Sequence, residues 1–567
     1  MGSGGAASEG SSVAVVDPAR SDEEETSRPS ALRRWLPIAL VAVVVVLPLR
    51  GLMRAPGPPM EEGFMLVFPE EVLRGAIPNR DFLHLYGPGS LWVLAALFKV
   101  FSTTLWTERV AGYLQQVALV AGVYAMVRPY GRRLAVGGAA IAAVIIIPPI
   151  GLTALAWVGG VALGLWAMVA ALRSRFLLAG LLGGFALLYR PDLMVAVGLG
   201  FAVLWRVLDR TERKRLLGGL GLGLSPYLIH VAMAGPGHAF YGMVIQPVFQ
   251  LRSGRHLPLP PSWSHFDGFL QRAGVLNEPP WPFPSPPSPG QLTLWLLLLV
   301  VAMFTMVVVG WQIARRSPAS LTARAAFVMG AFSLGLLPQA LQRPDSTHLA
   351  WVSAVPFGLL PVALADLVRR VRPGWSAARR LTVAALTPAV VLLLLVPHHT
   401  FRTYADAVAQ TFGKHRESYV ISNEGRSFYY GRKDAADAVN AMLPVADTIV
   451  RPGDKLFVGT GDLRKTPYSE AFLYYLLPQT HPGTRYIEMD PGVANRNDSG
   501  LADDLASSDI VILSSIRDDW VEPNAARDFG SDEPNQVLRR DFCMVGSWGK
   551  GLFGRGLYEL YQRCDRR

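Results

Sequence analysis

Charged residues are scarce in this chain: Asp, Glu, Lys and Arg make up 17% of its 567 residues, against about 25% in an average soluble protein. Apolar residues make up 51%, and the mean hydropathy is +0.29. This balance excludes a disordered or fibrous chain and argues against an ordinary soluble enzyme. Because most of the apolar excess lies in long uninterrupted runs, the sequence predicts a membrane protein.

Cysteine is almost absent, and several catalytic signatures are missing. Only Cys543 and Cys564 occur, with no CxxC or zinc-type spacing, no Walker loop and no GxSxG elbow. Both cysteines lie near the C-terminus, where an oxidising compartment would permit a disulfide. A hairpin turn near Lys550 and Gly551 would set Cys543 opposite about residue 559 rather than Cys564. The sequence therefore leaves their pairing open.

Acidic residues are few in the first 396 positions, which hold 33 Lys and Arg but only 19 Asp and Glu. Residues 397–567 hold 21 basic and 24 acidic residues. The basic excess lies in short loops between apolar runs, which is the positive-inside pattern of membrane proteins. We therefore exclude nucleic-acid binding and place these basic loops in the cytoplasm.

The apolar runs divide the chain into a tail, a membrane region and an outer domain. Residues 1–32 are predicted to be a disordered cytoplasmic tail, residues 33–396 a polytopic membrane domain, and residues 397–567 an extracytoplasmic domain. Loops 54–89 and 235–290 are expected outside, the second because it is rich in proline, including Pro279 and Pro280. Twelve apolar stretches occur, but the charge pattern requires an odd number of crossings. We expect 11 or 13 spans, with the short stretch 90–101 as the uncertain one.

The C-terminal region has the pattern of a small α/β domain. Residues 448–450, 455–458 and 510–513 are short β-type runs bounded by turn signals, and 468–477 and 499–507 are expected to be helical. Residues 541–545 and 556–561 flank a Gly-rich turn and predict a hairpin. The fold class is therefore an α-helical polytopic membrane protein with a C-terminal extracytoplasmic α/β domain.

The first outer loop concentrates residues that can do chemistry. It contains the run Met60-Glu61-Glu62-Gly63-Phe64, then Pro78-Asn79-Arg80-Asp81-Phe82, then His84-Leu85-Tyr86-Gly87-Pro88-Gly89. An acidic pair at the mouth of a span is costly unless it is solvated or used. A solvated loop with a helix-start signal remains the alternative to a functional site.

These motifs resemble the first outer loop of GT-C class glycosyltransferases, a class that includes protein O-mannosyltransferases and aminoarabinose transferases. The resemblance covers about residues 35–396 and is strongest over 60–101. It implies a polyprenyl-phosphate-linked sugar as donor and the first acidic residue of the pair as catalytic base. That residue is Glu61 here, where the family usually has Asp, and Glu62 is the substitute.

Two further motifs on the predicted outer face carry an Arg-Pro-Asp sequence. One holds Arg190 and Asp192, and the other holds Arg343, Asp345 and His348. A departing phosphate needs cationic donors, and the planar fork of Arg matches phosphate oxygens. We therefore predict a substrate site formed by residues of these motifs and of the first loop: Arg80, Asp81, His84, Tyr86, Arg190, Asp192, Arg343, Asp345 and His348. The alternative is that each motif is an interfacial Arg–Asp pair that caps a helix.

The leading functional prediction is an inverting GT-C glycosyltransferase in the cell membrane, transferring a hexosyl or pentosyl group to an extracytoplasmic acceptor. The acceptor would be a cell-wall glycan, a lipid or a protein. We expect no cofactor and no metal centre, and the expected partners are membrane lipid, the polyprenyl-phosphate sugar and the acceptor. A transporter or flippase for an envelope lipid or glycan is the alternative, although it would need ionisable residues along a mid-membrane path.

Overall fold

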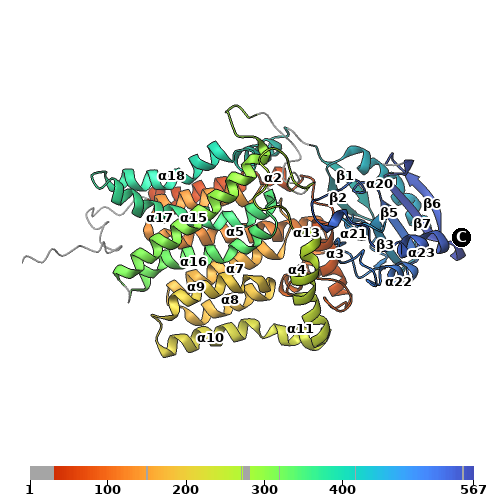
Figure 1. Cartoon of the computed structure of the whole chain (residues 1–567), viewed down its shortest axis with the longest axis horizontal. Helices are drawn as coiled ribbons and strands as arrows, with labels where there is room; N and C mark the ends of the chain where they lie inside the picture. Colours follow the sequence, from red (N-terminus) through yellow and green to blue (C-terminus); the bar gives the residue numbers. More distant parts are fainter. Residues whose placement is uncertain are drawn as a thin grey trace, which may run out of the picture.

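The computed structural model describes residues 31–148, 151–269, 271, 281–317, 320–414, 417–551 and 554–566. Most of the predicted tail and the prolines at 279 and 280 lie outside these residues. Figure 1 shows an elongated helical bundle with a mixed α/β region at one end, and α3, α13 and α21 lie where the two meet. The architecture is the predicted one: a largely helical chain followed by a C-terminal region that contains a sheet.

Seven helical segments among the described residues are long and apolar enough to cross a membrane. They are Trp35–Leu52 (α1 and α2), Leu105–Tyr130 (α5 and the following 3-10 turn), Arg210–Ala234 (α10 and α11), Ser288–Arg316 (α15), Ala323–Gln342 (most of α16), Ser346–Val371 (α17) and Ala377–Leu395 (α18). Four shorter helices run between them: α6 (Arg132–Ile146), α7 (Ala156–Leu172), α8 (Phe176–Tyr189) and α9 (Met194–Trp205). Small residues let several helices approach closely, since a Cβ at Gly180 or Gly219 would overlap the backbone of the facing helix.

Helix α4 (Gly89–Phe101) is apolar but has only 13 residues, fewer than a membrane span needs. Just before its first turn, the Gly87 N–H donates to the Tyr189 carbonyl at the end of α8. Just after its last turn, the Leu105 N–H donates to the Tyr475 hydroxyl of the C-terminal region. Both ends of α4 therefore lie at the same end of the bundle. The sequence left open whether 90–101 is a span, and this helix is not among the seven segments of the described residues that are long and apolar enough to cross a membrane.

The two predicted outer loops are partly helical. Helix α3 (Glu61–Leu73) precedes α4 in the first loop. The second contains α12 (Pro236–Phe240), the π-helical segment Tyr241–Gln250 and α13 (Leu251–Arg255), followed by irregular chain. These elements extend the bundle toward the C-terminal region.

The C-terminal region begins with α19 (Phe401–Thr411) and the hairpin of β1 (Tyr419–Asn423) and β2 (Arg426–Tyr430). Its five-stranded sheet has the order β4-β3-β5-β7-β6. The strands are β3 (Lys455–Thr460), β4 (His481–Pro482), β5 (Ile510–Ser514), β6 (Phe542–Trp548) and β7 (Tyr558–Arg563), and the helices are α20 (Lys433–Ile449), α21 (Phe472–Leu476), α22 (Leu501–Ala506) and α23 (Glu533–Asp541). The β3 and β5 strands run parallel, whereas β7 is antiparallel to β5 and β6.

Alternate side chains of the sheet enter two cores, as the period of two in a strand requires. Leu456 and Val458 belong to the core shared with α20, whereas Phe457 and Val511 pack with α22 and α23. The strands predicted at 455–458 and 510–513 are confirmed. The strand predicted at 448–450 is wrong, because that run is the end of the amphipathic helix α20.

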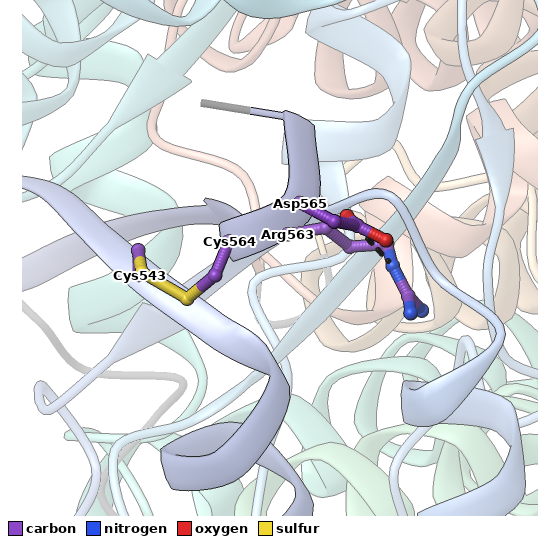
Figure 2. Close-up of a disulfide and its surroundings, with 4 residues drawn as sticks. All are labelled: Cys543, Arg563, Cys564 and Asp565. Atoms are coloured by element: carbon purple, nitrogen blue, oxygen red, sulfur yellow. Dashed lines mark hydrogen bonds and ion pairs between the residues drawn. A yellow bond between two sulfur atoms is a disulfide. The ribbon is translucent and has the colours of Figure 1, made fainter.

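Cys543 and Cys564 form a disulfide at the edge of this sheet (Figure 2). The hairpin connection spans residues 549–557 and β6 carries a register shift between Met544 and Gly546, so Cys543 lies opposite Gln562. The tighter turn expected from the sequence was wrong by about three residues. Because β7 ends at Arg563 and the chain then turns, Cys564 comes within 5.0 Å of Cys543 between Cα atoms.

Candidate active site

The acidic pair occupies the first turn of α3, at the junction between the bundle and the C-terminal region. Carboxylates are favoured there because they face the positive end of the helix dipole. Successive residues on a helix diverge by about 100°, so Glu61 and Glu62 reach different neighbours. Gly63 follows, and a Cβ at this position would overlap the backbone of Phe472. Only glycine permits α3 to lie this close to α21.

Glu62 is committed to a buried ion pair. Its two carboxylate oxygens accept hydrogen bonds from Arg109 Nε at 2.7 Å and Nη2 at 2.8 Å, and both side chains are almost fully buried. Arg109 also donates to the carbonyls of Leu52 and Met53. The pair ties α3 to α5 and to the end of the first span. The structure thus places Glu62 where it cannot meet an acceptor from solvent.

Glu61 is partly exposed and faces the C-terminal region. Its Oε2 atom accepts a hydrogen bond of 2.6 Å from the hydroxyl of Tyr468, and that hydroxyl accepts one from the Met60 N–H at 3.1 Å. Burial and the charge of Glu61 raise the pKa of Tyr468 well above its ordinary value. The tyrosine therefore stays protonated and remains a donor to the carboxylate.

Arg190 lies against aromatic rings at the end of α8. Its guanidinium is 4.2 Å from the centroid of Tyr86 and 5.0 Å from that of Trp157. Nε and Nη2 donate to the two carboxylate oxygens of Asp192 at 2.9 and 2.7 Å. The Arg190 side chain is 7% exposed while that of Asp192 is 46% exposed. Arg190 therefore contacts both Asp192 of its own motif and Tyr86 of the first loop.

Arg343 is held more tightly, by residues from three parts of the chain. It donates to Asp345 at 3.0 Å, to the Arg255 carbonyl at 2.8 Å and to Glu522 of the C-terminal region at 2.5 Å. Asp345 caps α17 through the His348 N–H and also pairs with the His348 ring. Burial acts to raise the pKa of Asp345, but His348 and Arg343 hold it below its ordinary value. Arg343 thus ties the second motif to the C-terminal region.

Arg255, which was not predicted from the sequence, lies next to the second motif, because its carbonyl accepts a hydrogen bond from Arg343. Its guanidinium pairs with Glu488 at 3.0 Å and with Asp490, both buried in the C-terminal region. Burial raises the pKa of Glu488 and Arg255 opposes that rise, while Glu61 and Arg190 are near enough to affect it too. Glu61, Arg190 and Arg255 therefore all lie near Glu488. The Arg255 side chain is 23% exposed, more than that of Arg190 or Arg343.

An open groove of about 440 Å³ lies beside the chain segments that carry Arg255 and Arg343. Its lining residues flank Arg255 and precede Arg343 in the chain: Arg252, Ser253, His256, Leu257, Leu341 and Gln342. The groove combines cationic, hydroxyl and apolar side chains. Such a surface suits a ligand with an anionic head and an apolar tail.

Other residues predicted for the site lie apart from it or are enclosed. Arg80 and Asp81 pair with each other at 2.9 Å, and both are more than a third exposed. His84 is buried between Phe68 and Tyr86, where burial lowers its pKa to about 3 and keeps it neutral. In the described ranges, no group of three or more His, Cys, Asp or Glu side chains is arranged to hold a metal ion.

Only one of the missed residues carried a usable sequence signal. Arg255 is a basic residue in a loop that the sequence predicts to be outside, where the positive-inside bias makes arginine uncommon. Tyr468 and Glu488 are more than 400 residues from Glu61 in sequence, within a domain whose pattern only indicated strands and helices. Arg109 lies inside an apolar run, and its partner could not be inferred without the packing of α3 on α5.

No protein-family model and no curated protein matches the chain. Solved structures match the chain over more than nine tenths of its length. ArnT from Cupriavidus metallidurans bound to undecaprenyl phosphate has 14% identity, covers 94% of this chain and 98% of its own, and has a TM-score of 0.49. The apo oligosaccharyltransferase from Archaeoglobus fulgidus has 12% identity, coverage of 93% and 76%, and a TM-score of 0.47.

The archaeal oligosaccharyltransferase AglB from Archaeoglobus fulgidus, in complex with an inhibitory peptide and a dolichol-phosphate, has 13% identity. It covers 91% of this chain and 73% of its own, with a TM-score of 0.47. Each of these matches extends over more than nine tenths of this chain, including the membrane region and the C-terminal region.

Proposed function

We propose that the protein is an integral-membrane, inverting glycosyltransferase that moves a sugar from a polyprenyl-phosphate donor to an acceptor hydroxyl outside the cytoplasm. The observation that carries the proposal is the pair of unequal carboxylates on α3. Glu62 is neutralised by Arg109, whereas Glu61 is partly exposed, is held by one hydrogen bond, and lies, like Arg190 and Arg255, near the buried carboxylate of Glu488. A carboxylate beside cations is the arrangement that base-assisted displacement of a phosphate needs.

In the proposed reaction, the Glu61 carboxylate takes the proton of the acceptor hydroxyl. The acceptor oxygen forms a bond to C1 of the sugar while the bond from C1 to the phosphate oxygen breaks. The phosphate leaves with the electron pair, so the products are the glycosylated acceptor, polyprenyl phosphate and a protonated Glu61. Attack on the face opposite the leaving group inverts the configuration at C1.

The three arginines have different roles in this proposal. Arg255 is the most exposed of them, and Ser253 and His256 beside it in the chain line the open groove, so we assign it the contact with the phosphate. Arg190 adds positive charge from a position fixed by Tyr86 and Asp192. Arg343 holds the Arg255 backbone and Glu522, and so it supports the site rather than contacting the donor.

The orientation follows from charge and chemistry. Basic loops mark the inner face. The disulfide of the C-terminal region is of a kind that forms and persists in an oxidising compartment. We therefore place the C-terminal region, Glu61 and the groove outside the cell membrane and the N-terminus in the cytoplasm. The proposed partners are membrane lipid, the lipid-phosphate sugar and a glycan or other envelope acceptor.

The test is Glu61→Gln, which keeps the shape of the side chain and removes its basicity. Transfer is measured in purified membranes as release of polyprenyl phosphate from a panel of synthetic polyprenyl-phosphate hexoses and pentoses. We expect a fall of about 100-fold or more, in line with general-base contributions, with donor binding retained. Glu424→Gln, the same change at an exposed turn of the C-terminal region, should leave the rate unchanged. Wild-type transfer by Glu61→Gln would refute the proposed base.

A further inference from the structure

The residue that holds Glu61 comes from the C-terminal region, 407 positions away in sequence. We infer that Tyr468 is a positioning residue for the catalytic base, and that the C-terminal region therefore forms part of the active site. This inference rests on the proposed function, because it assigns Tyr468 a role through Glu61.

The direction of the hydrogen bonds fixes which oxygen of Glu61 is available. The Tyr468 oxygen accepts from the Met60 N–H, so its own proton is left to point at Glu61 Oε2. The other carboxylate oxygen, Oε1, has no hydrogen-bond partner in the part of the chain that the structure describes. One oxygen is thus held in place while the other is left to take the acceptor's proton.

Tyr468 is itself held rigidly from behind. Its ring stacks on Trp520, with centroids 5.4 Å apart, and the Arg517 guanidinium lies 5.1 Å from its centroid. Arg517 Nε is 4.0 Å from Glu470, a buried carboxylate that accepts a hydrogen bond from Tyr430 at 3.2 Å. A buried and mutually paired network of this kind restricts the motion of its members.

The charged groups around this contact come from both regions. Glu488 and Arg517 act from the C-terminal region, with Glu470 behind Arg517. On α3 itself, the neighbouring carboxylate of Glu62 is neutralised by Arg109. Tyr468 is the hydrogen-bond donor to Glu61 in this group, so removing its hydroxyl changes one contact of the base and leaves the surrounding charges in place.

The experiment compares Tyr468→Phe with Tyr475→Phe in the full-length protein. Tyr475 is a matched control because its hydroxyl also crosses between the two regions, accepting from the Leu105 N–H at 3.3 Å without contacting Glu61. We expect Tyr468→Phe to lower kcat about tenfold, the order of magnitude for one hydrogen bond to a charged group, with an unchanged KM for the donor. Tyr475→Phe should keep the wild-type rate.

The split between kcat and KM separates positioning from mere packing. The Tyr468 hydroxyl contacts Glu61, so its loss should lower kcat and leave the donor KM unchanged in Tyr468→Phe, with neither constant changed in Tyr475→Phe. Equal losses of kcat in both variants would show only a loosened interface and overturn the inference. So would a wild-type kcat in Tyr468→Phe.

The two proposals fail in different ways. An inactive Glu61→Gln combined with a wild-type Tyr468→Phe removes the positioning role and leaves the base in place. A fully active Glu61→Gln removes the base and the positioning role together. Resistance to limited proteolysis, compared with the wild type, verifies that each variant is folded.

Discussion

The two Arg-Pro-Asp motifs share a sequence and a backbone but differ in what surrounds them. Arg190 and Arg343 each end a helix in an extended conformation, with φ near −142° and −149°. Each arginine pairs with the aspartate two residues on. Arg190 also lies against the rings of Tyr86 and Trp157 and donates to Gln339, whereas Arg343 is bound by Glu522 of the C-terminal region.

This difference shows how a local motif acquires two roles. Proline disfavours the helical conformation in the residue before it, so both arginines must leave the helix. Where each guanidinium then goes depends on the neighbours available. The first motif serves the proposed donor site, and the second joins the two regions of the molecule.

Among the variants that test this difference, Arg343→Ala should have the largest effect on stability. It leaves the carboxylates of Glu522 and Asp345 buried without their cation, at a cost of about 3–5 kcal/mol in the free energy of unfolding. Thermal unfolding in detergent measures it. Adding Glu522→Gln should recover part of the loss, because one uncompensated charge disappears. An unchanged unfolding temperature in Arg343→Ala would mean that the buried pair does not join the regions.

Replacing the two aspartates should show the same difference between the motifs, with smaller losses of stability. Asp345→Asn removes the charge facing Arg343 and His348 in a buried setting, and we expect a loss of about 1–3 kcal/mol. Asp192→Asn, at a side chain 46% exposed, should cost within about 0.5 kcal/mol. Urea or thermal unfolding of both variants decides this, and equal costs would remove the distinction between the motifs.

The low pKa of Asp345 adds a pH dependence with a definite sign. Its folded-state pKa lies below the unfolded value of about 3.9. Its stabilising contribution is therefore complete above that value and is lost as the pH falls through the folded pKa. The stability difference between wild type and Asp345→Asn should be greatest near neutral pH and shrink below about pH 4.

Arg190→Lys should affect transfer rather than folding. Lysine keeps the charge but loses the paired hydrogen bonds to Asp192 and the stacking on Tyr86 and Trp157. We expect about a tenfold lower kcat/KM for the polyprenyl-phosphate sugar and a nearly unchanged unfolding temperature. A variant that unfolds early but transfers normally would give Arg190 the role assigned to Arg343.

The assignment of both motifs to the outer face can be tested with cysteine variants that should leave the activity unchanged. Both native cysteines are in the disulfide, so an introduced cysteine is the single free thiol. Ser264 and Ser376 are exposed near opposite ends of the bundle. An impermeant thiol reagent should label Ser264→Cys in intact cells and should not label Ser376→Cys. The reverse pattern would invert the orientation and remove the proposed outer site.

The sequence by itself determined the features that depend on local pattern. Apolar runs became the long helices of the bundle, and the β-type runs at 455–458 and 510–513 became neighbouring strands. The helix before each Arg-Pro-Asp motif also ends at its arginine because the next residue is a proline. Such features are local because periodicity and proline sterics act between residues close in the chain.

Only the tertiary structure decided what the functional side chains do. Glu61 and Glu62 are chemically identical neighbours, yet Arg109 neutralises one and Tyr468 holds the other. The path of α4 and the pairing of Cys543 with Cys564 were likewise set by distant contacts and by the length of a connecting loop. The state of a carboxylate depends on the charges and donors within a few ångströms of it, and here those partners come from elements that only folding brings together.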